Sequence, residues 1–305
     1  MNSAHPDKDY LNTVTEEIHH SRSQTLNPAG RYLDRVASLP PAPTLVTELM
    51  ALFREPDRDV DQVVQLISYE PSLTAQILRM CNSACFAGEQ PPGDIFEAVS
   101  RLGFYQVYCL VVTLFGAQAK RMEGADRGVN VESLWRHSVA AAVSAAVVEE
   151  EAGQEKGAAF TAGLLHDIGK LALASVEGEP YARLFQLARE QGVALAVMER
   201  SAFGMDHAEL GGELMRRWNL PPDVVAAVRH HHQFEDAAPY ERLAAAVQAG
   251  DILAHHLFNE ELAGANVWAS LAAALLALGL SPDDLPGLLA KTQAGMERVK
   301  GLLQI

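Results

Sequence analysis

Apolar residues recur every three or four positions along most of the chain, a spacing that gathers them on one face of an α-helix. In the first half, the pattern predicts one helix around Leu45–Phe53 and another over Val60–Ser68. A third helix is expected to start at Pro71, because proline is favoured at the first helical position. Asp94 is a candidate cap for a fourth helix, and a longer one passes through Leu110–Phe115.

The second half carries the same pattern with shorter interruptions. The expected helices cover residues 131–151, 158–174, 180–191, 194–202, 206–218, 221–232 and 239–258, and a last helical segment covers 267–305. Pro221 supports one of these starts, and Ser281 is a candidate cap inside the last segment. Because no clear alternating pattern typical of a β-strand occurs, we expect an all-α fold, a multi-helix bundle.

The charged, glycine-rich stretch from Arg121 to Val129 is the best candidate for an internal boundary. We therefore expect a mobile tail at 1–30, an N-terminal helical subdomain at 31–122 and a histidine-bearing helical subdomain at 130–260, the two subdomains packed together. A C-terminal helical segment at 261–305 completes the chain. Its apolar part is expected to cover the core, with an oligomer interface as the alternative.

Composition favours a helical fold, and the net charge argues against nucleic-acid binding. Hydrophobic residues make up 49 % and aromatic residues 7 %, a balance that favours packed helices over a sheet. With 39 acidic against 24 basic residues, the net charge of −15 repels phosphate backbones, so we expect no direct contact with nucleic acid.

Three features bear on the compartment. The three cysteines lack a disulfide framework, and the N-terminus lacks the apolar core of a signal peptide. The longest apolar run, Val107–Ala117, is too short to span a bilayer. We therefore expect a cytoplasmic protein without membrane contact.

The dipeptide His166-Asp167 is the first candidate for chemistry, because apolar residues flank it on both sides. Burying an unpaired carboxylate costs several kcal/mol, so such a group needs a cation or a full set of hydrogen-bond donors. Asp251 stands in a similar setting of small and apolar residues. The sequence therefore predicts a metal site on the helical bundle, with a hydrogen-bond network made entirely by the protein as the alternative.

Seven residues form the predicted ligand set: His137, His166, Asp167, His207, His231, His232 and Asp251. The first His, the His-Asp pair and the last Asp would enclose one ion, and the other three histidines could hold a second ion bridged by Asp167. Imidazole and carboxylate ligands suit one or two divalent transition ions; iron or manganese is expected, with nickel or zinc as alternatives. We assign no ligand role to His230, His255 or His256, because single histidines are usually surface or core residues.

Several motifs in one order resemble the HDOD domain of the HD superfamily of metal-dependent phosphohydrolases. They are the ordered residues His137, His166-Asp167 and Asp251, the HDIG sequence His166–Gly169, and the stretches Leu39–Pro43, Ile67–Thr74, Ile77–Ala84, Ile95–Gly103 and His207–Gly211. The resemblance covers about residues 32–260.

The resemblance implies a bacterial, helical protein of signal transduction and regulation. Many HDOD proteins have lost the HD ligands, whereas this chain keeps them. His207 and His231-His232 resemble the extra ligands of the HD-GYP cyclic dinucleotide phosphodiesterases, and Lys170 is similar to a lysine that those enzymes use near the leaving group. The Gly-Tyr-Pro element is absent, and Gln233–Tyr240 stands in its place, which argues against cyclic dinucleotide hydrolysis.

Two functions follow from the sequence. The first is a bacterial cytoplasmic signalling or regulatory protein that binds a metal and acts mainly through contacts with a signalling protein. The alternative is a metal-dependent phosphohydrolase or phosphodiesterase for a nucleotide or cyclic dinucleotide, with Asp167 and Lys170 as catalytic residues. Basic residues near the motif are scarce, and Arg101, Arg136 and Arg229 are the arginines nominated for a phosphate. The sequence specifies neither the partner nor the oligomeric state.

Overall fold

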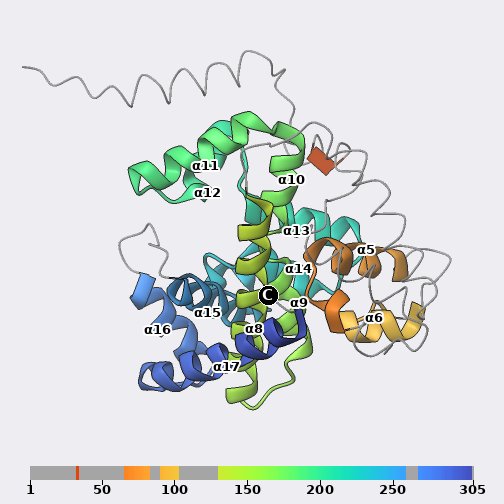
Figure 1. Ribbon diagram of the computed structural model, residues 1–305, viewed down its shortest axis with the longest axis vertical. Helices are drawn as coiled ribbons and strands as arrows, with labels where there is room; N and C mark the ends of the chain where they lie inside the picture. Colours follow the sequence, from red (N-terminus) through yellow and green to blue (C-terminus); the bar gives the residue numbers. More distant parts are fainter. Residues whose placement is uncertain (1–31, 34–64, 83–89, 103–129, 259–266, 304–305) are drawn as a thin grey trace, which may run out of the picture.

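The computed structural model describes residues 32–33, 65–82, 90–102, 130–258 and 267–303. All regular secondary structure in these ranges is helical, and none of it is a strand (Figure 1), as the sequence pattern predicts. The expected N-terminal tail, the helices around Leu45–Phe53 and Leu110–Phe115, and the boundary at 121–129 lie outside the described residues.

Among the described residues of the N-terminal half, two helices are complete, α5 (Pro71–Cys81) and α6 (Ile95–Leu102), and residues 65–68 of the helix expected over Val60–Ser68 are also helical. Helix α5 begins where the proline predicts, and the carboxylate of Glu70 accepts the N–H of Leu73 at 2.5 Å. A carboxylate at this position satisfies a backbone donor that the first turn leaves without a partner. Asp94 likewise accepts from the first turn of α6, so the expected cap is confirmed.

Helix α8 (Val131–Glu151) runs through the middle of the molecule and packs mainly against α15 (Glu241–Leu257) and α9 (Gly157–Leu165) (Figure 1). The close approach depends on two glycines. A Cβ on Gly250 would lie 2.8 Å from the carbonyl of Ala141, and one on Gly163 would lie 3.0 Å from the same oxygen. Small residues on facing helices thus bring three backbones together around the alanine-rich part of α8.

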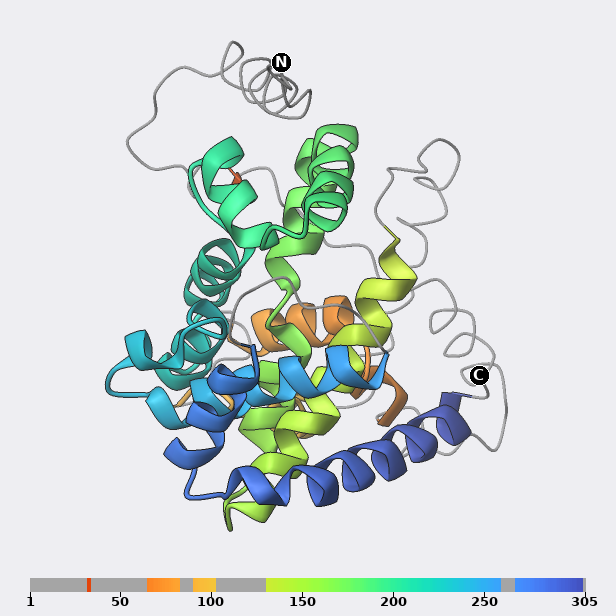
Figure 2. The same cartoon turned by 90° about the vertical axis from the view of Figure 1, so that its left-hand side faces the viewer.

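The remaining elements surround this centre. They are α10 (Ile168–Glu177), α11 (Glu179–Gln191), α12 (Leu195–Phe203), α13 (His207–Arg217), α14 (Pro222–Arg229), α16 (Val267–Ala277) and α17 (Leu285–Leu303), with 3-10 turns η1 (Phe234–Ala237) and η2 (Pro282–Asp284). Figure 2 shows α11 and α12 together at one end, and α16 and α17 near the other.

Two expected helices are interrupted where the histidine motifs occur. The helix expected over 158–174 is divided into α9 and α10 by His166 and Asp167, and the helix expected over 221–232 stops at Arg229. The apolar spacing continues through both breaks, so the sequence pattern does not reveal them. Each break turns its polar side chains toward the same interior region.

Hydrogen bonds connect the N-terminal segment that contains α5 and α6 to the histidine-bearing bundle; we call the contact between these two parts the seam. Asn82, the C-cap of α5, donates its side-chain amide to the carbonyls of Trp218 and Asn219, both at 3.1 Å. The indole of Trp135 donates to the carbonyl of Tyr69 at 2.9 Å. Trp135 and Trp218 are both buried, and one hydrophobic cluster contains residues from both sides of the seam.

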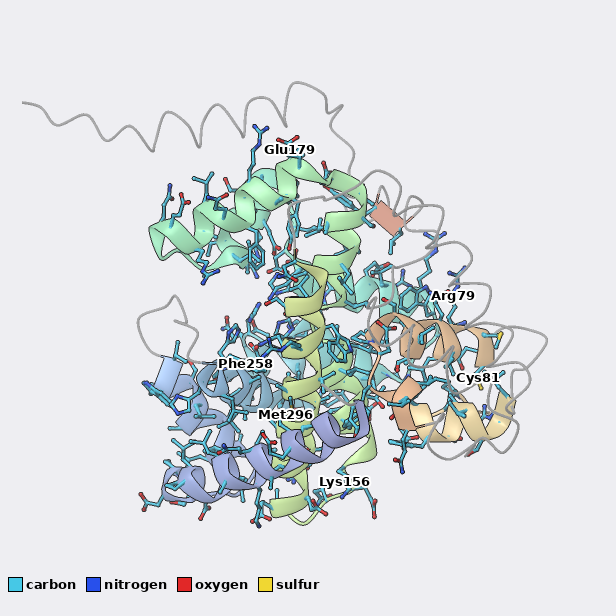
Figure 3. All side chains as sticks on the ribbon, viewed as in Figure 1. Arg79, Cys81, Lys156, Glu179, Phe258 and Met296 are labelled. Carbon is cyan, nitrogen blue, oxygen red and sulfur yellow. The ribbon has the colours of Figure 1, made fainter. Side chains whose placement is uncertain are left out.

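The C-terminal helices cover the central ones: α16 packs against α15, and α17 packs against α8. Met296 of α17 and Phe258 at the end of α15, both labelled in Figure 3, lie against a small alanine cluster that includes Ala141. Within the described ranges, no single helix has the length and apolar character needed to cross a membrane; α16 and the segment Pro282–Glu297 meet the criteria only as a pair bent by 106°.

Candidate metal centre

The seven predicted ligand residues come from five places in the fold and meet in one region. His137 lies on α8, Asp251 on α15 and His207 at the first position of α13, while His166-Asp167 and His231-His232 occupy the two helix breaks. Groups of three side chains drawn from this set each place candidate ligand atoms within 4.8 Å of one another. The fold therefore brings together residues that are up to 114 positions apart in the sequence.

Asp167 faces one group of ligands with its Oδ2 atom. The Nε2 atoms of His166 and His137 lie 3.3 and 3.8 Å from this oxygen. Asp251 closes the group, because its Oδ1 lies 3.0 Å from Nε2 of His137 and 3.6 Å from Nε2 of His166. This first group contains two imidazoles and two carboxylates, a donor set suited to a transition ion.

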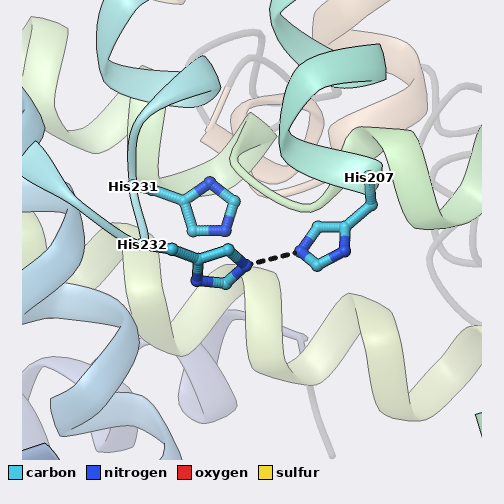
Figure 4. A group of neighbouring side chains, drawn as sticks. All are labelled: His207, His231 and His232. Atoms are coloured by element: carbon cyan, nitrogen blue, oxygen red, sulfur yellow. Dashed lines mark hydrogen bonds between the residues drawn. The ribbon is translucent and has the colours of Figure 1, made fainter. Parts of the chain in front are cut away.

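The other oxygen of Asp167 faces three histidines. Its Oδ1 lies 3.4 Å from Nε2 of His207 and 3.9 Å from Nε2 of His231. His232 reaches Nε2 of His207 at 2.9 Å, and the three rings point toward one another from α13 and from the turn after α14 (Figure 4). Asp167 thus stands between two groups of candidate ligands.

Second hydrogen bonds hold the histidine rings in a ligand-like orientation. Nδ1 of His166 donates to the carbonyl of Gly163 at 2.7 Å, and Nδ1 of His231 donates to the carbonyl of Val228 at 2.8 Å. Each ring therefore directs Nε2 inward. Histidines that bind metals typically donate their other ring nitrogen to a carbonyl or carboxylate in this way.

Three inward-facing atoms are buried and lack any hydrogen-bond partner: Nε2 of His166, Oδ1 of Asp167 and Nε2 of His231. A buried polar atom without a partner costs about 1–3 kcal/mol, and such atoms are rare in folded proteins. Coordination to a cation would satisfy all three. The donor set and its unmet polar atoms therefore fit a divalent metal ion.

Glu199 is a site residue that the sequence analysis missed. This buried carboxylate on α12 accepts hydrogen bonds from Nδ1 of His207 at 2.6 Å and from the hydroxyl of Tyr181 at 2.7 Å. Burial alone would raise the pKa of Glu199, but the contacts with His207 lower it. A lone Glu on an amphipathic helix gives no sequence signal of such a role.

His255 is the second residue that the sequence analysis missed. One helical turn after Asp251 on α15, its Nε2 lies 3.4 Å from Oδ1 of that carboxylate. The ring of His255 also lies 4.3 Å, between centroids, from the ring of His137. The spacing of four residues places both side chains on one helix face, which is the signal that could have identified it.

The metal-free centre concentrates opposite charges. Burial alone would lower the pKa of His166, but the negative charges of Asp167 and Asp251 raise it to about 10. Burial alone would raise the pKa of Asp167, but the charges of His166 and Lys170 hold it well below its ordinary value. A proton on His166 thus supplies, without an ion, part of the positive charge that the carboxylates require.

Two other histidines stay neutral. Burial, assisted by the neighbouring His232, holds the pKa of His231 well below its ordinary value. Burial also lowers the pKa of His137, although Asp251 partly opposes this shift. Neutral imidazoles are the form that binds metal ions, so these two rings need no deprotonation.

Lys170 lies at the centre and is not a freely solvated lysine. Its Nζ lies 2.6 Å from Oδ2 of Asp167, and its side chain is 12 % exposed. Its neighbour Gly169 explains how this turn fits, because a Cβ there would overlap the carbonyl of His207. The glycine of the HDIG sequence therefore permits contact between the starts of α10 and α13.

The three nominated arginines do not complete a phosphate pocket at the centre. Arg101 pairs with Glu97 on its own helix at 2.7 Å, and the guanidinium of Arg136 lies over the ring of Phe258. Arg229 lines a separate cavity of about 490 Å³. Besides the protonated His166, Lys170 brings a positive charge to the carboxylates of the centre.

Comparisons with known proteins show which proteins this chain resembles in sequence and in fold. The HDOD domain matches residues 39–234 of the chain. The crystal structure of the MmoQ response regulator from Methylococcus capsulatus str. Bath is 29 % identical, with a TM-score of 0.66, over 83 % of this chain and 98 % of that one. An uncharacterized protein from Treponema pallidum is 27 % identical over 218 residues, and ribonuclease Y from Lawsonia intracellularis is 25 % identical over 194 residues.

These alignments differ in how much they cover. They include 71 % of this chain but 42 % of the Treponema protein, and 64 % of this chain but 30 % of the ribonuclease. The chain thus spans less than half the length of these two relatives. The family match covers most of the candidate centre, and the His/Asp cluster suits a divalent metal.

Proposed function

The chain belongs to the HDOD family, and we propose that it is a bacterial cytoplasmic regulatory protein of signal transduction that holds a divalent metal centre and acts mainly through contacts with a signalling protein. Iron or manganese is the proposed metal, with nickel or zinc as alternatives. The proposed ligands are the seven residues of the centre, to which we add His255.

The burial of the centre is the observation that carries the regulatory proposal. His166, Asp167 and His231 are at most 2 % exposed, and Asp251 is 7 % exposed. Catalytic metal sites keep an open coordination position that a substrate can reach, whereas structural sites are closed. A buried centre with a single neighbouring lysine fits an ion that stabilises one conformation of the bundle better than an ion that turns over a phosphate ester.

The bundle offers a physical route from the metal to the surface. His207 is the first residue of α13, and the other end of that helix, at Arg217, lies beside the seam with the N-terminal helices. An ion that binds His207 stabilises the start of this helix. Metal loading would thus favour one arrangement of α13 against α5, which a protein partner can distinguish.

A specific observation also favours the phosphohydrolase as a second candidate. The two oxygens of Asp167 face separate groups of ligands, an arrangement suited to two ions that would activate water and polarise a phosphoryl group. Lys170, held by Asp167, is then the residue that would stabilise the leaving oxygen. His232 is the exposed member of the centre and marks the side from which a nucleotide would enter.

One comparison separates these candidates. The metal-loaded full-length chain and its Asp167→Ala variant are assayed with bis(p-nitrophenyl) phosphate and with cyclic dinucleotides, and their thermal midpoints are measured in parallel. The regulatory proposal expects a metal-dependent rise in the midpoint without turnover above that of the variant. Metal-dependent turnover that disappears in Asp167→Ala would contradict the regulatory proposal and support the phosphohydrolase.

A further inference from the structure

One oxygen of Asp251 lies close to three histidines that differ in their exposure to solvent. Its Oδ1 atom is 3.0 Å from Nε2 of His137, 3.6 Å from Nε2 of His166 and 3.4 Å from Nε2 of His255. The side chain of His166 is fully buried, whereas that of His255 is 21 % exposed. Asp251 therefore connects the buried part of the metal centre with a histidine that solvent reaches.

Two sets of three candidate ligands overlap at His137. We call His137, His166 and Asp167 the inner triad, and His137, Asp251 and His255 the outer triad; in each, the candidate ligand atoms lie within 4.8 Å of one another. The side chains of His166 and Asp167 are 0 and 1 % exposed, and that of His137 is 6 % exposed. The corresponding values are 10 % for Asp251 and 21 % for His255. Exposure to solvent thus increases from the inner triad to the outer triad.

The outer triad has a donor set and a spacing that suit a transition ion. Asp251 and His255 stand four positions apart on α15, so their side chains lie on one face of that helix. His137 joins them from α8, which packs against α15. Two imidazoles and one carboxylate also bind the metal of catalytic zinc sites, in which a further position stays open to water. An ion held by the outer triad would therefore remain exchangeable.

The ring of His137, which both triads share, lacks the second hydrogen bond that fixes other rings of the centre. Nδ1 of His166 donates to a backbone carbonyl, and Nδ1 of His207 contacts the carboxylate of Glu199. By contrast, Nδ1 of His137 is buried and has no hydrogen-bond partner in the described part of the chain. Such a second bond normally holds a ligand histidine in one orientation. Without it, the ring of His137 is free to turn between the two triads.

We propose that the outer triad is the position through which an ion enters and leaves the metal centre, an inference that rests on the proposed metal-binding function. A buried metal site requires an entry path. The ion binds the outer triad first, and His137 and Asp251 then remain bound while His166 and Asp167 replace His255. Exchanging one ligand at a time keeps the charge of the ion satisfied as it is buried. His255 therefore sets how fast the centre gains and loses metal, and leaves its capacity unchanged.

Rates of metal exchange test the proposal, with Co²⁺ as the probe because its visible absorption reports binding. The metal-free full-length chain is mixed with one Co²⁺ per chain, and the loaded chain is later mixed with a chelator. In His255→Gln we expect loading and release both to be about tenfold slower, which corresponds to a barrier higher by about 1.4 kcal/mol, with unchanged final Co²⁺ content and affinity. His256→Gln is the matched control, because the ring of His256 lies against Trp268 of α16. Unchanged rates in His255→Gln, equal slowing in the control, or a loss of affinity without slower loading overturns the proposal.

His255→Cys keeps a ligand at this position and makes its contact with the ion visible. A thiolate bound to Co²⁺ absorbs in the near ultraviolet, and the wild-type chain gives the baseline. We expect this absorption to appear early during loading and then to disappear as the ion moves inward, at a loading rate near that of the wild-type chain. Absorption that never appears, or that persists after loading, overturns the proposal.

The same measurements separate this proposal from the metal centre itself. A wild-type chain that takes up no Co²⁺ contradicts both. Normal loading of the wild-type chain together with normal rates in His255→Gln overturns only the entry position. Slow loading in His232→Gln but not in His255→Gln would place the entry at the exposed member of the other ligand group, and would also overturn the proposal.

Discussion

The carboxylate of Glu199 lies 2.6 Å from Nδ1 of His207 and also accepts the backbone N–H of the same residue at 2.9 Å. Two hydrogen bonds from one residue fix both the ring of His207 and the start of α13. The Nε2 atom of that ring consequently faces Oδ1 of Asp167. Glu199 is therefore a positioning residue for the second group of ligands.

Replacing this carboxylate should weaken metal binding without removing a ligand. Glu199→Gln keeps the size of the side chain but removes the charge that orients His207, so we expect a loss of about 10- to 100-fold in affinity for one ion. Competition with a chelator measures the change. Glu190→Gln, at an exposed position on α11, is the control. Wild-type affinity in Glu199→Gln would remove the positioning role.

The two aspartates should differ in how much metal their loss releases. Asp167→Ala removes a carboxylate that faces both ligand groups, so we expect the chain to lose all bound metal. Asp251→Ala affects only the group with His137 and His166, so we expect metal to remain at the three other histidines. Elemental analysis of both variants provides the comparison. Undiminished metal in Asp167→Ala would show that the site lies elsewhere.

The raised pKa of His166 predicts a pH dependence of metal binding. Below a pKa of about 10, the ring of the metal-free protein holds a proton that an incoming ion must displace. One proton should leave per ion at this position, and Mn²⁺ affinity should rise about tenfold for each pH unit between pH 6.5 and 8. Calorimetry in buffers of different ionisation enthalpy counts the protons. A pH-independent affinity would contradict the protonated state of His166.

The raised pKa of His166 should also make the stability of the metal-free chain depend on pH. Because the folded pKa of His166 lies above the value of about 6.5 in an unfolded chain, its charge stabilises the fold most strongly below pH 6.5. This contribution is lost as the pH rises through about 10. Urea unfolding of the chelator-treated wild-type chain and of His166→Gln should therefore give free energies of unfolding whose difference shrinks with rising pH. A difference that grows with rising pH would contradict the raised pKa of His166 in the folded chain.

Two glycine-to-alanine variants should change the free energy of unfolding in opposite directions. Gly250→Ala would place a Cβ 2.8 Å from the carbonyl of Ala141, so we expect a loss of about 1–3 kcal/mol in the free energy of unfolding. Gly287→Ala, in α17, meets no atom within 4 Å and should stabilise the helix by about 0.5–1 kcal/mol. Denaturant unfolding of both variants measures the two values. Equal effects would argue against the close contact of α15 with α8.

The sequence pattern predicts the helices well because their apolar spacing and caps are local properties. Helix α8 spans the expected residues 131–151, and α5 starts at the expected proline. The breaks at 166–167 and after Arg229 were not predicted, because apolar residues flank both and the spacing continues. These breaks depend on contacts between distant segments, such as the approach of Gly169 to His207, which local spacing does not contain.

The sequence likewise identifies some residues of the candidate centre and misses others. The residues chosen by type and motif lie together, because buried carboxylates and histidines in apolar surroundings have few alternative uses. Glu199 and His255 were missed, since one looks like an ordinary helix residue and the other like a single histidine near a helix end. Their roles become visible only when α12 and α15 are placed beside the remaining ligands.

The metal content of the wild-type chain, purified without chelator and without air, tests the account most directly. Elemental mass spectrometry should find about two transition ions per chain, since Asp167 faces two groups of ligands. A single ion would restrict the centre to one of those groups. A chain that remains free of metal, even after incubation with Fe²⁺ or Mn²⁺, would contradict the account.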